Sequence, residues 1–371
     1  MKYTRRKLLK NGLLFTGLLA SGGLTGLSRG KAEEKSCEIS LKRIEEIRNN
    51  IISGGPPPDG IPPIEEPEYV TAKKITGPLG GLLEEDSVVI GLNYNGQIKA
   101  FPRSILVYHE IVNEVVKGEK ISVTYCPLTG SAIGYKGKIN SLETTFGTSG
   151  KLVNSNLVMY DRENGTDSYW SQILGRSLSG PLKGENLEQF PLIWTTWGRW
   201  RENHPETLVL TTDTGHSRPY GRDPYGSYRE KGTYYQTGSP NFPVMAKSDR
   251  FPPKKVVTGI KVNGCTLAVP KDEFRKKVVV NIALGGEPVA VIYDRELDAV
   301  RAFERRLGGS TLEFSFREGK LIDRNTGSEW KPDGSAVEGS MTGENLTPVT
   351  FFDVMWFGWY AFYPETRVLT V

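Results

Sequence analysis

Residues 88–125, VVIGLNYNGQIKAFPRSILVYHEIVNEVVKGEKISVTY, align without a gap on residues 256–293, VVTGIKVNGCTLAVPKDEFRKKVVVNIALGGEPVAVIY, 168 positions further along the chain. Thirteen of the 38 aligned positions are identical, whereas average amino-acid usage would give roughly two or three by chance. Shorter matches follow, such as Gly184–Leu187 with Gly343–Leu346 and Pro205–Thr207 with Pro364–Thr366. The sequence therefore predicts a tandem duplication of one module.

The pattern inside the first copy predicts a β-rich module. Val88–Tyr94 and Gln97–Phe101 flank Asn95-Gly96, the pair of residues that a two-residue hairpin turn with positive φ favours. A strand is expected over Ile121–Cys126, where apolar residues alternate, and a last strand over Leu208–Thr212.

Two helices are expected in the same copy. Pro102 suits the first turn of a helix running to about Val116, with apolar residues spaced three and four apart on one face. A second, short helix is predicted over Thr196–Asn203. The fold class that follows is α+β, mostly antiparallel β, as a tandem duplication of one β-rich module with one early helix in each copy.

The whole chain divides into five segments on this basis. They are a twin-arginine signal peptide (1–32), an N-terminal helix and Pro/Gly-rich arm (33–87), module 1 (88–212), a Tyr/Arg/Gly-rich cap loop (213–250) and module 2 (251–371), a degenerate repeat acting as scaffold. We expect the cap loop to be packed, because aromatic residues at this density seldom stay solvated.

The N-terminus predicts export. Thr4–Lys10, TRRKLLK, has the twin-arginine form, and the glycine-rich apolar run Gly12–Leu27 is short for a membrane span. The expected partner is the twin-arginine export machinery, and the expected location is periplasmic, cell-envelope or extracellular, with no stable membrane span in the mature chain. An uncleaved N-terminal anchor is the alternative, since the same charge and apolar pattern serves both.

The charge and the cysteine content exclude some classes of protein. The net charge is +4, but residues 1–32 hold seven basic residues and no acid, so the remainder keeps 40 basic and 43 acidic residues, a charge of −3. This argues against a nucleic-acid partner. The three cysteines are an odd number, so at least one is unpaired within the chain, and a fold stapled by disulfides is not expected.

Comparing the two copies places a candidate site in module 1. His109 is replaced by Lys277, Cys126 by Asp294 and His204 by Tyr363 in the second copy. Loss of a thiol and two imidazoles is expected if module 2 is scaffold. It is also expected from drift at unimportant positions.

The leading hypothesis for module 1 is one soft-metal site. Cys126 thiolate and His109 imidazole, with Met159 or His204 as a further ligand, would suit copper or zinc. The structural alternatives are a buried free cysteine at Cys126, a core histidine at His109 and a helix-end histidine at His204. Glu110 lies off the apolar stripe and is expected to be solvated.

Two other functions stay open. Cys126 and His109 could form the nucleophile and base of an enzyme, with Asp161 or Asn113 orienting the imidazole. No Gly-x-Ser-x-Gly elbow, phosphate-binding loop or dinucleotide fingerprint accompanies them.

The third hypothesis is a non-catalytic envelope module that binds a small molecule, glycan or peptide. Its candidate contacts in the cap loop are Arg218, Tyr220, Arg222 and Tyr225. The tryptophan pairs Trp197/Trp200 and Trp356/Trp359 occur in both copies at helical spacing, so we expect them in the core.

Residues 50–250 contain many stretches typical of one family. They are Ser53–Pro62, Tyr108–Asn113, Thr124–Leu128, Gly147–Gly150, Asn154–Arg162, Trp170–Gln172, Thr195–Leu210 and Asp213–Tyr225. On these, the chain resembles domain-of-unknown-function family 3179, with the degenerate second copy after it. The resemblance implies an exported or envelope setting and supplies no activity. Many members read Cys-Pro-Leu-Cys where this chain has Cys126–Thr129, so two-cysteine redox chemistry is not expected here.

Overall fold

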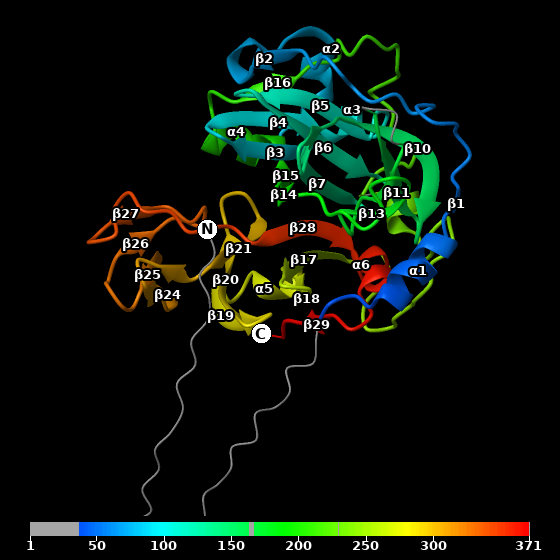
Figure 1. Ribbon diagram of the computed structural model, residues 1–371. Helices are drawn as coiled ribbons and strands as arrows, with labels where there is room; N and C mark the ends of the chain where they lie inside the picture. Colours follow the sequence, from blue (N-terminus) through cyan, green and yellow to red (C-terminus); the bar gives the residue numbers. More distant parts are fainter. Residues whose placement is uncertain (1–36, 163–166, 229, 371) are drawn as a thin grey trace, which may run out of the picture. The chain divides into compact units, whose positions relative to one another are not determined.

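The structure is a computed structural model that describes residues 37–162, 167–228 and 230–370 (Figure 1). The predicted signal peptide lies outside these residues. Helices are few and short: α1 (Leu41–Asn49), α2 (Gly77–Leu82), α3 (Arg103–Leu106), α4 (Trp197–Asn203), α5 (Lys271–Phe274) and α6 (Trp356–Phe362), with 3-10 turns η1 (Ala72–Lys74) and η2 (Tyr234–Gln236). None of the helices in the described ranges is long and apolar enough to cross a bilayer.

The first half of the chain forms three main sheets and one small ribbon. In spatial order their strands are β15 (Ile193–Thr196), β3 (Val88–Tyr94), β4 (Gln97–Pro102), β16 (Leu208–Leu210) and β2 (Tyr69–Thr71); β14 (Gln189–Phe190), β7 (Ser131–Lys136), β6 (Glu119–Cys126) and β5 (Ile111–Val116); β1 (Ile52–Ser53), β10 (Phe146–Val153), β11 (Asn156–Asp161), β12 (Tyr169–Ser171) and β13 (Arg176–Ser179); and β8 (Lys138–Ile139) with β9 (Leu142–Glu143).

The second half has a similar set of sheets. In spatial order their strands are β28 (Thr350–Met355), β17 (Val256–Val262), β18 (Cys265–Pro270) and β29 (Arg367–Val368); β19 (Val279–Leu284), β20 (Glu287–Asp294) and β21 (Ala299–Glu304); β24 (Phe314–Arg317), β25 (Lys320–Asp323), β26 (Glu329–Trp330) and β27 (Ala336–Glu338); and β22 (Arg306–Leu307) with β23 (Ser310–Thr311). The predicted α+β class, mostly antiparallel β, is confirmed.

The two halves use the same local pairings. The predicted hairpin is present as β3–β4, whose turn residues Asn95 and Gly96 have φ angles of 49° and 75°. The β17–β18 hairpin has the same register 168 residues later. Strand β4 pairs in parallel with β16, and β18 with β29. These matches are consistent with the predicted duplication, which remains a prediction.

The tryptophan pairs lie in the core, as predicted. Trp200 covers Gly91, where a Cβ atom would meet the indole ring at 2.1 Å, and Trp359 covers Gly259 in the same way at 2.2 Å. Both indoles are buried. Two of the hydrophobic clusters contain residues from both halves of the chain, so the halves share apolar cores.

The long helix predicted from Pro102 to Val116 is wrong. Only α3 is helical, and after a left-handed residue at Glu110, with φ of 57°, the chain continues as β5. Ile111, Val112, Val115 and Val116 are β-branched and pair with β6 along its length. The three-and-four spacing of apolar residues was shared by a short helix and a strand, and sheet pairing decided between them.

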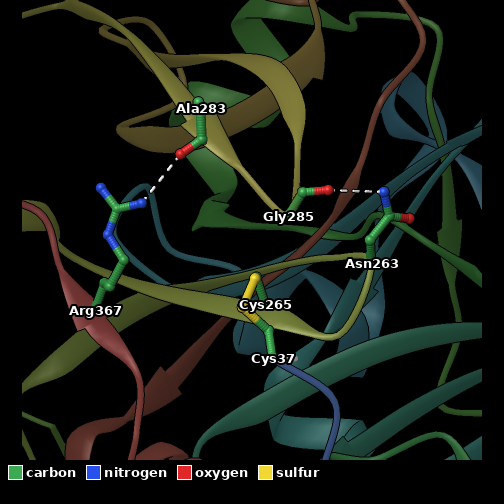
Figure 2. The surroundings of a disulfide bond; sticks show 6 residues. All are labelled: Cys37, Asn263, Cys265, Ala283, Gly285 and Arg367. Atoms are coloured by element: carbon green, nitrogen blue, oxygen red, sulfur yellow. Dashed lines mark hydrogen bonds between the residues drawn. A yellow bond between two sulfur atoms is a disulfide. The ribbon is translucent and has the colours of Figure 1, made fainter. Parts of the chain in front are cut away.

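A disulfide joins Cys37 and Cys265, 228 residues apart (Figure 2). It ties the segment before α1 to the first residue of β18, next to a turn where Asn263 donates a 3.0 Å hydrogen bond to the Gly285 carbonyl. The expectation of a chain without a stapling disulfide is therefore wrong, because residues far apart in sequence meet in the fold. Cys126 is the free cysteine among the described residues, and it is buried.

Candidate functional site

The cap loop packs over module 1 and borders a pocket. Within 213–250 the described residues contain one regular element, η2, yet Tyr220, Tyr234 and Tyr235 are buried. The loop is held by two hydroxyls that donate to carbonyl oxygens: Tyr108 to Arg222, and Tyr234 to Leu128 at 2.6 Å. These contacts agree with a packed cap, which stays a prediction, because most of the other described residues of the loop are exposed or half-buried.

The pocket lies between this loop, α2 and α3, and has a volume of about 1190 Å³. Its lining combines aromatic rings with charged and hydroxyl groups. The main ones are Arg103, Tyr108, Tyr220, Arg222, Asp223, Tyr225, Glu230, Thr233 and Tyr234. A large concave site with aromatic walls and a few convergent polar groups is typical of small-ligand binding sites.

Three of the four predicted ligand-binding residues line this pocket. Tyr220, Arg222 and Tyr225 are among its walls. Arg218 lies in a neighbouring pocket of about 310 Å³, which Tyr220 also lines. That these residues bind a ligand stays a prediction.

An ion pair lies at one wall of the pocket. The Arg103 guanidinium at the start of α3 pairs with the Asp223 carboxylate of the cap loop, and both side chains are largely buried. Arg103 Nη1 also donates to the Tyr235 hydroxyl at 3.2 Å. The Tyr228 and Tyr235 rings, stacked at 3.9 Å, lie 5.2 and 5.3 Å from the guanidinium, within the range of cation–π attraction.

Several polar atoms around this ion pair are unsatisfied. Arg103 Nε and the hydroxyls of Tyr125 and Tyr228 are buried and have no hydrogen-bond partner among the described residues. The two hydroxyls lie close to one another, and burial is the main cause that raises the pKa of both tyrosines. Leaving a buried polar group unsatisfied costs about 1–3 kcal/mol, so such groups require an explanation.

His109 is fully buried and both of its ring nitrogens are engaged. Nδ1 donates to the Pro62 carbonyl oxygen at 2.7 Å, which leaves Nε2 to accept from the Tyr220 hydroxyl at 2.7 Å. Burial is the main cause that lowers the pKa of His109, to about 4. The imidazole is therefore neutral at physiological pH and ties the Pro-rich arm to the cap loop.

Cys126, at the end of β6, is buried with 1 % of its surface exposed. Burial, and next the charge of Glu110, raise the pKa of its thiol to about 11. A cysteine in such surroundings is protonated at neutral pH and a poor nucleophile. No described contact joins Cys126 to His109.

Glu110 is buried, not solvated as predicted. It is 6 % exposed and its carboxyl group has no hydrogen-bond or ion-pair partner among the described residues. Burial alone raises its pKa to about 8. The expectation failed because it assumed a helix, and the left-handed turn at Glu110 directs the side chain inward.

The other two predicted metal ligands, Met159 and His204, lie on different elements of module 1. Met159 is buried in β11 opposite Trp170, in the same apolar cluster as Cys126. His204 follows α4 and lines a different pocket, and its ring lies tilted against that of Trp200, with the ring centroids 4.3 Å apart. Within the ranges that the structure describes, no group of three or more His, Cys, Asp or Glu side chains is arranged to hold a metal ion.

The proposed orienting residues of an enzyme have other partners. Asp161 accepts a 3.0 Å hydrogen bond from Trp170 Nε1. The Asn113 amide nitrogen donates to the Phe146 carbonyl oxygen at 2.8 Å, and its oxygen accepts from the Ser122 hydroxyl at 2.6 Å. Neither residue contacts the His109 imidazole.

Residues that the sequence did not single out complete the pocket. Arg103, Tyr108, Asp223 and Tyr234 carry its polar and aromatic walls. The pairing of Arg103 with Asp223 crosses 120 residues, and no local pattern predicts it.

Comparison with known proteins gives one match. A family model described as "Protein of unknown function (DUF3179)" matches residues 58–366. The match runs through the second half of the chain, further than the expected residues 50–250. No curated protein and no solved structure matches. Because the model covers most of the 371 residues, the chain belongs to the DUF3179 family.

Proposed function

We propose that this protein is an exported, non-catalytic binding module that holds a glycan or peptide in the pocket beneath the cap loop. The observation that carries the proposal is the pocket of about 1190 Å³ whose walls include Tyr220, Arg222 and Tyr225. Tyrosine supplies large contact area with a polar tip and loses little conformational entropy on binding. The arginine, carboxylate and hydroxyl groups provide donors and acceptors for a polar ligand.

The test is calorimetric titration of the purified mature chain with a panel of oligosaccharides and short peptides. Arg222→Ala removes an exposed side chain from the wall, and the proposal expects weaker binding of any ligand found. Lys231→Ala is the matched control, since Lys231 is an exposed cation of the same loop outside the pocket lining. Equal loss in both variants, or no binding by the wild type, would contradict the proposal.

A soft-metal site remains the second candidate. The observation in its favour is the free thiol of Cys126 in one apolar cluster with Met159 and Met355, since thiolate and thioether ligands favour copper. Against it, His109 uses both ring nitrogens elsewhere. Elemental analysis of the tag-free wild type and of the Cys126→Ser variant tests for such a site. About one equivalent of copper or zinc in the wild type, absent from the variant, would support this hypothesis.

Export is supported by the disulfide between Cys37 and Cys265. Disulfides persist in oxidising compartments and are rare in the cytosol. Together with the twin-arginine sequence, this favours an envelope or extracellular location. In this proposal the second half of the chain is a duplicated scaffold that supports the binding half.

A further inference from the structure

Arg103 uses only one of its three nitrogens for hydrogen bonds to described residues. Nη1 pairs with the Asp223 carboxylate and donates to the Tyr235 hydroxyl. A guanidinium carries five N–H donors, so the three on Nε and Nη2 are without a partner in the described part of the chain. The edge formed by Nε and Nη2 is one that carboxylates bind in a bidentate manner.

Asp223 satisfies only the Nη1 end of the guanidinium, and Arg103 itself lines the pocket.

Asp223 is a carboxylate that reaches Arg103 from the cap loop. Its other oxygen accepts a 2.8 Å hydrogen bond from Tyr225 N, so the loop itself presents it. In the second half, Lys271 aligns with Arg103 and pairs instead with Asp298, in the turn before β21, and with Asp353 of β28, at 3.5 and 4.0 Å. Neither of these partners lies in the cap loop.

We propose that Arg103 receives the carboxylate of an acidic sugar on the edge formed by Nε and Nη2, beside Asp223 on Nη1. The inference rests on the proposed function and names its ligand class. The rings of Tyr108 and Tyr225 in the pocket wall suit the faces of sugar rings, and the short side chain of Ser104 suits their hydroxyls. Entry of the ligand carboxylate satisfies the unpaired donors of Arg103, and Asp223 stays on Nη1.

The charge of Asp223 lies beside the bound carboxylate and repels it, so Asp223 should weaken binding. Asp223→Asn removes that charge and keeps an oxygen that can accept from Tyr225 N. The variant is therefore expected to bind an acidic sugar several-fold more tightly than the wild type. A carboxylate with a purely structural role would give the opposite result, because its loss would loosen the cap and weaken binding.

The experiment is calorimetric titration of the mature chain with trigalacturonate, with neutral galactotriose as the matched ligand. We expect trigalacturonate to bind at least tenfold more tightly. Arg103→Gln should abolish this preference, Asp223→Asn should increase the affinity for the acid, and Lys271→Gln, the aligned cation of the second half, should change neither. Asp223→Asn retains the guanidinium, so its result holds even if Arg103→Gln fails to fold.

The results that would contradict the role of Arg103, the sugar class and the proposed function differ from one another. Equal affinity for both trisaccharides, or weaker acid binding in Asp223→Asn, overturns the role of Arg103 and leaves the pocket as a binding site. Binding of a triaspartate peptide in an Arg103-dependent manner, without binding of trigalacturonate, overturns the sugar class. Absence of binding by sugars and peptides alike contradicts the proposed function itself.

Discussion

Glu110 and Val278 occupy the same left-handed backbone position in the two halves of the chain, with φ angles of 57° and 66°. Each carbonyl oxygen accepts a hydrogen bond from a tyrosine N–H, Tyr125 at 2.6 Å and Tyr293 at 2.7 Å. A positive φ is unusual for a β-branched residue such as valine, so the surrounding backbone imposes this conformation. The carboxyl group of Glu110 is therefore not needed for the turn.

Replacing Glu110 by Gln should stabilise the protein at neutral and alkaline pH. Its pKa is raised by burial from 4.5 to about 8, so the folded state holds a proton that the unfolded state releases, and stability falls as pH rises between these values. At pH 7 the variant should gain about 3 kcal/mol, and at pH 4 almost nothing. Urea unfolding at both pH values measures this.

Glu318→Gln is the matched control for that prediction. Glu318 also has a positive φ, of 51°, but its side chain is exposed. Its replacement should leave the free energy of unfolding unchanged at either pH. An equal gain for Glu110→Gln at pH 4 and pH 7 would show that the carboxyl group does not titrate as described.

The buried pair Lys99–Glu114 should be replaceable by apolar residues. Both residues are less than 9 % exposed and they form an ion pair, whereas Leu267 and Ile282 stand at the aligned positions of the second half. Lys99→Leu alone should cost roughly 3–5 kcal/mol, because it leaves a buried charge unpaired. Lys99→Leu with Glu114→Ile should restore or exceed wild-type stability in urea unfolding; a double variant as unstable as the single one would refute this.

The Cys37–Cys265 disulfide should contribute to stability. Cys37→Ser removes a cross-link over 228 residues and should lower the free energy of unfolding by roughly 2–5 kcal/mol. Thiol titration of the unfolded, unreduced wild type should find one free thiol, that of Cys126. Cys126→Ser provides the control, because it leaves the cross-link intact. Three titratable thiols in the wild type would disprove the pairing.

Tyr220→Phe should raise the pKa of the His109 imidazole towards its ordinary value and weaken the attachment of the cap loop. The variant deletes the hydroxyl that donates to Nε2 and costs about 1 kcal/mol. In the wild type the lowered pKa, about 4, keeps the ring neutral. NMR titration of the ring nitrogens should show Nδ1–H and unprotonated Nε2 at pH 6; a charged ring at that pH would exclude this arrangement.

Local sequence patterns predicted the elements that local chemistry determines. Asn95-Gly96 predicted its hairpin because few residues accept the turn's positive φ, and the tryptophan pairs were correctly placed in the core. The predicted helix to Val116 failed because pairing with β6, a non-local interaction, decided the structure of Ile111–Val116.

The candidate site was predicted in part for the same reason. The density of aromatic residues identified the cap loop, and three of its four predicted contacts line the pocket. The Arg103–Asp223 pair and the Cys37–Cys265 disulfide join residues more than a hundred positions apart. Such contacts depend on the tertiary fold, and local patterns in a single sequence do not reveal them.

The central claim is that the pocket beneath the cap loop holds the ligand. A crystal structure determined in the presence of acidic and neutral trisaccharides tests it most directly. We predict ligand density between α3 and the cap loop, in contact with Tyr108, Arg222 and Tyr225. Density for the ligand elsewhere on the molecule, with this pocket filled only by water, would contradict the account.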